Sequence, residues 1–323
     1  MSVGDVRRPA VTFSNDRANA VADLEAPRAP AHTLAMTEAS QVFRAGEPRA
    51  VPGGLSLVGY RSEGLAEGTH LGVPSASLTF ILSLDGPVVG APTAPDLAQG
   101  RTRSAEVLLS GLDTAATHVH QPSHQEGVQL ALDPLACRAL FGVPAGALSR
   151  GMAEPDQLGA RGRDLWQRVG EARTWGERFG LVADQLTAWV VASDDGAPRP
   201  ELVGAWRLLK RHHGALRMDD LAAAVALSPR QLRSLFRAEF GIGPKTAARL
   251  MRFDRALAEI TRAVRAGTGP DLARVAAVCG YADQAHLARD FRGFMGCSAT
   301  GWMADERRNI QAGGHDHGAD SRP

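Results

Sequence analysis

The side chains best suited to chemistry are arginines and polar residues that recur at helical spacing in the last third of the chain. An arginine guanidinium can donate two parallel hydrogen bonds to a phosphate or to a guanine base. Two segments place such groups on one face of a predicted helix. The candidate contact residues are Arg230, Arg233, Ser234 and Arg237 in the first segment, and Gln284, His286, Arg289 and Arg292 in the second. Lys245, which lies between the two segments, is a further candidate for contact with phosphate.

The two segments belong to an internal repeat. The first copy starts at Leu221 and reads LAAAVALSPRQLRSLFRAEFG; the second starts at Val275 and reads VAAVCGYADQAHLARDFRGFMG. Each copy predicts a short alanine-rich helix, a tight turn, and a second helix that is capped by Ser228 or Asp283 and ends at a glycine. A helix, a tight turn and a second helix form the helix-turn-helix pattern, and two tandem copies are a strong signal.

Apolar residues at three- and four-residue spacing predict the buried face of each second helix. They are Leu232, Leu235, Phe236 and Phe240 in the first copy, and Leu287, Phe291 and Phe294 in the second. The candidate contact residues then lie on the outer faces. Between the copies, the chain after Gly243-Pro244 predicts a long amphipathic helix that holds the two units at a fixed separation. Such a spacer lets one chain read two major grooves, which lie about 34 Å apart on one DNA face.

Charge is unevenly distributed along the chain. Residues 201–310 hold 18 basic and 11 acidic residues, a net charge of +7, whereas the remainder carries −6. Lys210 and Lys245 are the only lysines, so the positive charge is almost entirely arginine. A basic C-terminal third favours a polyanionic partner.

Residues 205 to 308 resemble the DNA-binding domain of AraC/XylS-type transcriptional regulators. The resemblance rests on Leu221-Ala222, Leu227-Ser228-Pro229-Arg230-Gln231-Leu232, Phe236-Arg237, Phe240-Gly241, Pro244-Lys245, the Arg252-to-Leu257 segment, the run CGYADQAHL from Cys279, and Phe291-Arg292. It implies two helix-turn-helix units joined by a linker helix, double-stranded DNA as the partner, and a role as a transcription activator. The positions that it places toward the DNA grooves are Arg230, Arg233, Ser234, Gln284, His286 and Arg289.

The chain departs from that family pattern at three positions. Ala226 stands where the first turn usually has glycine, and Ala299 and Met303 stand where proline and arginine are usual. Trp302 fits the aromatic position of the closing segment. The N-terminal domain resembles, less specifically, the accessory domain of some family members.

The predicted fold class is α+β. Short strand-like runs after residue 50 predict an N-terminal antiparallel sheet or barrel, which is followed by helices and then by the all-α domain of two helix-turn-helix units and their linker helix. The expected organisation is a disordered lead at 1–40, an effector-binding or dimerisation domain at 41–192, a linker at 193–200, a DNA-binding domain at 201–310 and a disordered tail at 311–323.

A metal-dependent enzyme is the main alternative. His118, His120 and Glu126 after Gly111 resemble the first metal motif of cupin barrels. Such a barrel needs a further histidine, and none occurs between residues 124 and 212, so we expect solvated histidines and no metal. No nucleotide-binding glycine loop, serine nucleophile elbow or catalytic carboxylate pair stands out. We therefore expect no catalytic residue, no cofactor and no enzyme activity.

The sequence thus favours a sequence-specific, DNA-binding transcriptional regulator that reads two successive major-groove segments. The alternatives are a cupin-like enzyme with a regulatory DNA-binding tail, and a non-specific DNA-packaging protein. RNA polymerase, a small-molecule effector and a second copy of the chain are candidate partners. No run of about 20 apolar residues and no secretory signal are present, so we expect a cytoplasmic protein without a membrane partner.

Overall fold

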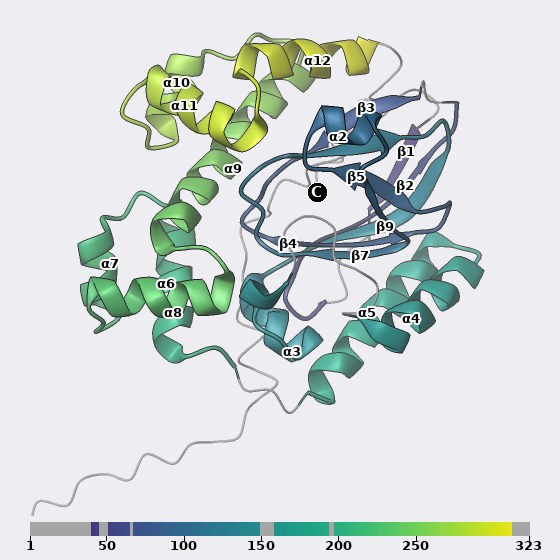
Figure 1. Ribbon diagram of the computed structural model, residues 1–323, viewed down its shortest axis with the longest axis horizontal. Coiled ribbons are helices and arrows are strands. Elements are labelled where there is room, and N and C mark those ends of the chain that lie inside the picture. The colour runs from purple at the N-terminus through teal and green to yellow at the C-terminus, as the bar shows by residue number, and fades with distance from the viewer. Residues whose placement is uncertain (1–39, 45–50, 65–66, 149–157, 194–196, 312–323) are drawn as a thin grey trace, which may run out of the picture.

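A computed structural model describes residues 40–44, 51–64, 67–148, 158–193 and 197–311 of the chain. The lead and tail that we expect at the two ends lie almost wholly outside these ranges. The described part consists of two antiparallel sheets with flanking helices, followed by a region that is entirely helical (Figure 1). The predicted α+β class is confirmed.

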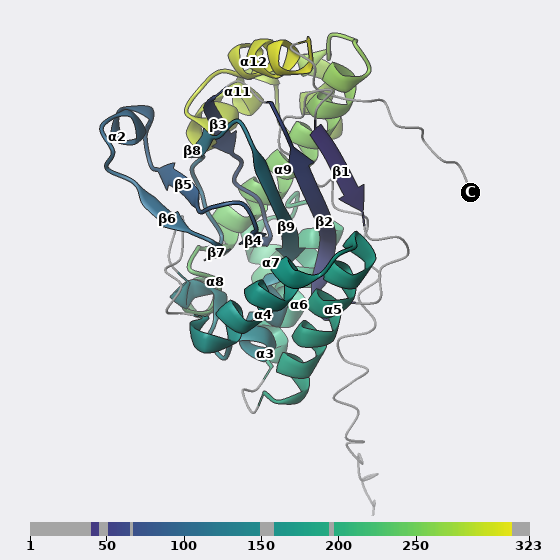
Figure 2. The ribbon, with the colours of Figure 1, turned by 90° about the vertical axis from the view of Figure 1, so that its right-hand side faces the viewer.

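The N-terminal region is built on two sheets in which every strand pair is antiparallel. The five-stranded sheet has the order β1 (Ser40–Arg44), β2 (Gly54–Ser62), β9 (Gln125–Leu132), β4 (Leu78–Ser83) and β7 (Val107–Ser110). The four-stranded sheet has the order β3 (Gly68–Gly72), β8 (Thr117–Gln121), β5 (Val88–Ala91) and β6 (Arg103–Ala105). The helix α2 (Ala94–Ala98) joins β5 to β6. The two sheets lie opposite each other, as Figures 1 and 2 show.

Helices after β9 complete the N-terminal region. They are the 3-10 turn η1 (Pro134–Ala136), α3 (Cys137–Phe141), the 3-10 turn η2 (Ala145–Ala147), α4 (Gly159–Glu171) and α5 (Trp175–Val191). Asp133 caps the first of them through Leu135 N–H, and Gly142 ends α3 with a left-handed φ of 72°, as the Asp-Pro start and the glycine predict. The helices α4 and α5 cover the five-stranded sheet (Figure 2), where Trp166 Nε1 donates to the Ser83 carbonyl at 2.6 Å.

The C-terminal region contains the two predicted helix-turn-helix units. Its helices are α6 (Pro200–Arg211), α7 (Met218–Ala224), α8 (Pro229–Phe240), α9 (Pro244–Arg265), α10 (Leu272–Val278), α11 (Gln284–Met295) and α12 (Ala299–Gln311). Ser228 and Gln231 form a capping box at the start of α8, and Asp283 caps α11 through the His286 N–H at 2.6 Å. Both second helices end at a left-handed glycine, Gly241 or Gly296.

The predicted inner faces of α8 and α11 are buried, except that Leu235 is only half-buried. Phe236 and Phe240 stack on Trp206 of α6, with ring centroids 5.9 and 4.6 Å away. In the second unit, Phe253 of α9 packs against Phe291 at 5.5 Å. Because α9 contributes buried residues to both units, it fixes one unit relative to the other.

The tryptophans and cysteines of the chain are largely internal. Trp189 is buried, and Trp166 and Trp175 are half-buried against the core. Cys137 and Cys279 are buried. In the described part of the chain, every helix is too short or too polar to cross a membrane.

Candidate nucleic-acid interface and interdomain cavity

The outer face of α8 presents the candidate contact residues of the first unit. Arg230, Arg233, Ser234 and Arg237 are all exposed, and Lys245 is exposed in the first turn of α9. Within the described part of the chain, the four basic side chains form no hydrogen bond or ion pair. The buried stripe Leu232, Phe236 and Phe240 lies on the opposite side of the helix, so helical periodicity turns the arginines to solvent.

The second unit repeats this arrangement on α11. Gln284, Arg289 and Arg292 are exposed. His286 is half-buried instead, because its imidazole packs edge-on against the Tyr281 ring with the ring centroids 5.1 Å apart. Its side chain must therefore leave the Tyr281 contact, or reach past it, to touch a base.

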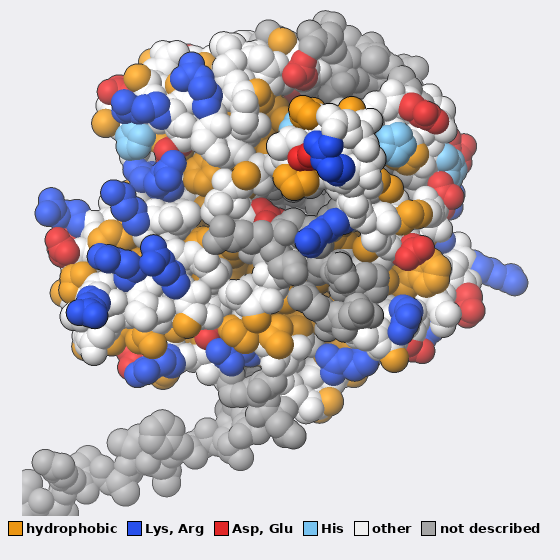
Figure 3. Space-filling model, viewed as in Figure 1, with side chains coloured by type: hydrophobic (Ala, Val, Ile, Leu, Met, Phe, Trp, Pro, Cys, Tyr) orange, Lys and Arg blue, Asp and Glu red, His pale blue; other side chains and the backbone are white. Residues whose placement is uncertain are grey.

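Basic side chains gather over the two units. In Figure 3, lysine and arginine side chains cluster on the side of the molecule that α7, α8, α10 and α11 form in Figure 1. Positive potential on that side attracts the phosphate backbone of DNA.

Two ion pairs and one close backbone approach tie the N-terminal region to α6 and to the first unit. Arg138 of α3 donates a bidentate pair of hydrogen bonds to Glu239 of α8, with N···O distances of 2.9 Å for both Nε to Oε1 and Nη2 to Oε2. Lys210 Nζ lies 3.0 Å from the buried carboxylate of Asp133. Gly146 abuts the C-terminal end of α8 so closely that a Cβ on it would lie 2.6 Å from the Gly241 nitrogen.

The second unit and α9 are also tied to the N-terminal region. Ala116 N–H donates to the Phe294 carbonyl at the end of α11, at 2.7 Å. Ala76 N–H donates to Asp254 Oδ2 of α9 at 2.8 Å. The N-terminal region therefore contacts both helix-turn-helix units and the helix between them. Sequence reasoning missed these contacts; the one available signal was the acidic residue Glu239 between the apolar positions Phe236 and Phe240.

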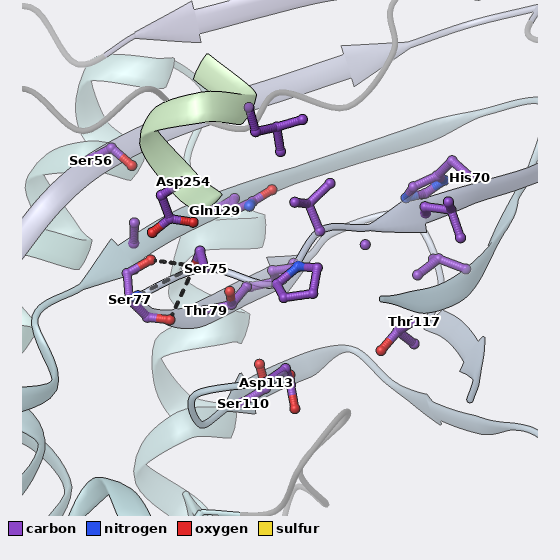
Figure 4. A pocket seen from close by; sticks show the side chains of 18 of the residues that line it. Ser56, His70, Ser75, Ser77, Thr79, Ser110, Asp113, Thr117, Gln129 and Asp254 are labelled. Carbon is purple, nitrogen blue, oxygen red and sulfur yellow. Dashed lines mark hydrogen bonds between the residues drawn. The ribbon is translucent and has the colours of Figure 1, made fainter. Parts of the chain in front are cut away.

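A cavity of about 1020 Å³ lies between the two sheets and α9. Figure 4 shows polar side chains from several elements turned toward it. Its hydroxyl and amide groups include those of Ser56, Ser75, Ser77, Thr79, Thr117 and Gln129, and its apolar wall includes Leu71, Val73, Ile81, Val88, Leu108 and Val119. A largely apolar space with a few converging polar groups is the usual form of a small-molecule site.

Asp254 and His70 are the most perturbed titratable groups of the cavity wall. Burial raises the pKa of Asp254 to about 7, although the hydrogen bond from Ala76 N–H acts in the opposite direction. Its second oxygen, Oδ1, is shielded from solvent and has no hydrogen-bond partner in the described part of the chain. Burial lowers the pKa of His70 to about 4, and the nearby His120 adds to the effect. His70 is therefore neutral at physiological pH.

The cupin-like metal set does not assemble in the described ranges. His118 and His120 lie on β8 of the four-stranded sheet, whereas Glu126 lies on β9 of the other sheet. Glu126 accepts hydrogen bonds from Arg61 at 2.9 Å and from Arg178. Burial alone would raise the pKa of Glu126, but these two arginines outweigh it and the pKa is lowered. Among the described residues, no group of three histidine, cysteine or acidic side chains is placed to hold a metal ion.

A family model described as a helix-turn-helix domain matches residues 221–305. The C-terminal region is an AraC-type helix-turn-helix domain. The match begins within α7 and ends within α12, so both units of the AraC-type domain and α9 lie inside it. The resemblance read from the sequence motifs is confirmed.

Solved structures also resemble the chain. ToxT from Vibrio cholerae O395 shares 9% identity over 83% of this chain and 98% of that chain, with a TM-score of 0.44. Unsaturated-fatty-acid-bound ToxT from Vibrio cholerae strain SCE256 shares 10% identity over 76% and 94%, with a TM-score of 0.43. The AraC-like transcriptional activator CuxR shares 13% identity over 72% and 89%, with a TM-score of 0.27. No curated protein matches the chain.

Proposed function

We propose that this DNA-binding transcription regulator reads two successive major-groove segments, one with α8 and one with α11. The observation that carries the proposal is that both second helices of the AraC-type domain expose polar and basic outer faces and are held by the same helix, α9. The major groove of B-DNA admits one α-helix, and two helices on one rigid unit reach two grooves on the same face.

The positions along each helix suggest different roles for the basic residues. Arg233 and Arg289 lie on the outer faces, where a guanidinium reaches guanine O6 and N7. Arg237 is in the last turn of α8 and Lys245 in the first turn of α9, so both are better placed for phosphate. Arg230, Ser234, Gln284, His286 and Arg292 complete the proposed interface.

A salt titration of DNA binding tests this division. The probes are a duplex that the full-length protein enriches from random DNA and a scrambled duplex of the same composition. Arg233→Ala should cost about 1–3 kcal/mol on the enriched duplex and much less on the scrambled one. Arg237→Ala and Lys245→Ala, the matched controls, should weaken both duplexes alike and reduce the salt slope by about one unit each. Equal weakening of both duplexes by Arg233→Ala would show that α8 does not read bases there.

Footprinting tests the two-groove arrangement separately. The full-length protein should protect two major-groove segments about 10 base pairs apart on one DNA face. Protection of one short segment per chain would contradict the proposal, and equal protection of scrambled DNA would favour the packaging alternative.

The cavity supports a second function, the binding of a small-molecule effector. It is bounded by both sheets and by α9, so a molecule inside it contacts the N-terminal region and the helix that joins the two DNA-binding units. RNA polymerase and a second copy of the chain stay predicted partners, and activation, the cytoplasmic location and the domain boundaries stay predictions.

A further inference from the structure

The cavity contains one carboxylate whose bonding is incomplete. Asp254 Oδ2 accepts the Ala76 N–H, whereas Oδ1 is shielded from solvent and has no partner within the described residues. A buried polar atom without a partner carries the full cost of losing its water. The structure therefore holds an unused hydrogen-bond acceptor at the wall of a large cavity.

No cation is paired with Asp254 in the described part of the chain. The influences that set its pKa are burial and the Ala76 N–H, with no contribution from a neighbouring cation. Arg255, the next residue on α9, acts on His213 and Cys279 instead. A pKa of about 7 means that about half of the Asp254 carboxyl is protonated at neutral pH, and a cation bound beside it would lower that pKa and keep the group charged.

The groups beside Asp254 are suited to an ammonium ion. Ser56, Ser77 and Gln129 line the same cavity as Asp254 and are labelled with it in Figure 4; they come from β2, from the loop before β4 and from β9. An ammonium group has three N–H donors and no acceptor, and it requires acceptor oxygens on several sides. Asp254 Oδ1, the serine hydroxyls and the Gln129 amide oxygen are such acceptors. A carboxylate ligand would instead place a second negative charge in the same site.

The rest of the cavity is suited to an apolar body. Leu71, Val88 and Val119 of the four-stranded sheet and Ile81 and Leu108 of the five-stranded sheet line it. His70 is neutral, so it adds no charge to this wall. Transfer of a hydrocarbon chain into such a space is favourable by about 0.8 kcal/mol for each buried CH₂ group.

We infer that the cavity binds a small amphipathic amine, with its ammonium group on Asp254 and its apolar part between the two sheets. The inference rests on the proposed effector function and gives that effector a chemical class. Asp254 belongs to α9, whereas the other acceptors belong to the N-terminal region. The bound amine would therefore contact the N-terminal region and the DNA-binding region at the same time.

The test compares three probes of equal chain length on the full-length protein: hexylammonium, 1-hexanol and hexanoate. Titration calorimetry at pH 7.5 should give binding of hexylammonium at least tenfold tighter than that of either other probe, since a charge-assisted hydrogen bond is roughly twice as strong as a neutral one. Equal or tighter binding of hexanol or hexanoate, or no binding of any probe, would overturn the inference. This comparison uses the unaltered chain, so it does not depend on the folding of a variant.

Two matched variants then locate the ammonium group. Asp254→Asn should weaken hexylammonium binding at least tenfold. Asp85→Asn removes the same charge at another residue of the cavity wall and should change binding less than twofold. Unchanged binding by a folded Asp254→Asn protein would refute the assignment. Hexylammonium could bind without changing the affinity of the protein for the enriched DNA duplex. That result would refute the proposed effector function but would support the inference that the cavity binds an amine.

Discussion

Replacement of Ala226 by glycine should stabilise the protein. Ala226 forms the turn of the first helix-turn-helix unit with a φ of 54°, in the left-handed region that favours glycine. The second unit has Gly280 at the corresponding position, with a φ of 78°. A Cβ atom in this conformation costs roughly 1–2 kcal/mol. The first unit therefore folds with a strain that the second unit lacks.

The magnitude follows from three properties of the turn. Ala226 is exposed, so removal of its methyl group leaves no cavity. Its N–H donates to the Ala223 carbonyl at 3.1 Å, and glycine keeps that hydrogen bond. Glycine also makes the unfolded chain more flexible, which offsets about 0.4–1 kcal/mol of the gain. The net stabilisation expected for Ala226→Gly is about 1 kcal/mol.

Two further variants serve as controls. Gly280→Ala introduces the same strain into the second unit, where the new Cβ would meet Ala215 Cβ at an ordinary contact distance of 3.8 Å. It should destabilise by about 1 kcal/mol. Ala223→Gly makes the same chemical change at an exposed position inside α7, where glycine costs roughly 0.5–1 kcal/mol.

Urea unfolding of the full-length protein measures all three variants. Ala226→Gly should raise the midpoint and the two controls should lower it, each without a change in the m-value. If Ala226→Gly destabilises the protein as much as Ala223→Gly does, the left-handed turn does not strain the first unit and the reasoning is wrong.

Three other outcomes are expected. Arg138→Ala should lower the unfolding free energy by about 2–4 kcal/mol in urea titrations, because it leaves the buried carboxylate of Glu239 without its bidentate partner. The pKa of Asp254 is about 7 in the folded state and near 4 in the unfolded state, so stability should fall as pH rises from 5 to 8. Asp254→Asn should remove about 2–3 kcal/mol of that fall, as urea titrations at both pH values would show. Finally, a fragment from residue 200 onward should bind DNA in an electrophoretic mobility assay at low salt; a folded fragment without DNA affinity would contradict this.

The helix-turn-helix units were predictable because their signals are local. The Ser228–Gln231 capping box and the Asp283 cap each involve residues three positions apart. The helix ends at Gly241 and Gly296 depend on one residue each. These capping interactions join residues within about one helical turn, so they can be recognised in the sequence without knowledge of the tertiary contacts.

The arrangement of the N-terminal strands was not predictable in the same way. His120 and Glu126 are six positions apart, yet they belong to different sheets. The strand β9 pairs with β2 and β4, and β8 pairs with β3 and β5. Which strand pairs with which depends on contacts between distant residues, so closeness in sequence does not decide whether two residues share a site.

The contacts between the two regions were hidden for a related reason. A single acidic residue on an amphipathic helix is usually solvated, and Glu239 and Asp254 fit that pattern in the sequence. The structure pairs Glu239 with Arg138 and Asp254 with Ala76, each more than 100 residues away. No local signal specifies either partner.

These contacts have a consequence for how an effector would control DNA binding. The N-terminal region holds α8 at Glu239 and Gly241, near its C-terminal end, and it holds α11 at Phe294. Arg233 and Arg289 remain exposed in the full-length chain, so the docked N-terminal region does not cover the proposed reading faces. Two major grooves accept the two helices only at a matching separation and angle. A molecule between the sheets and α9 would therefore not control DNA binding by uncovering these two faces.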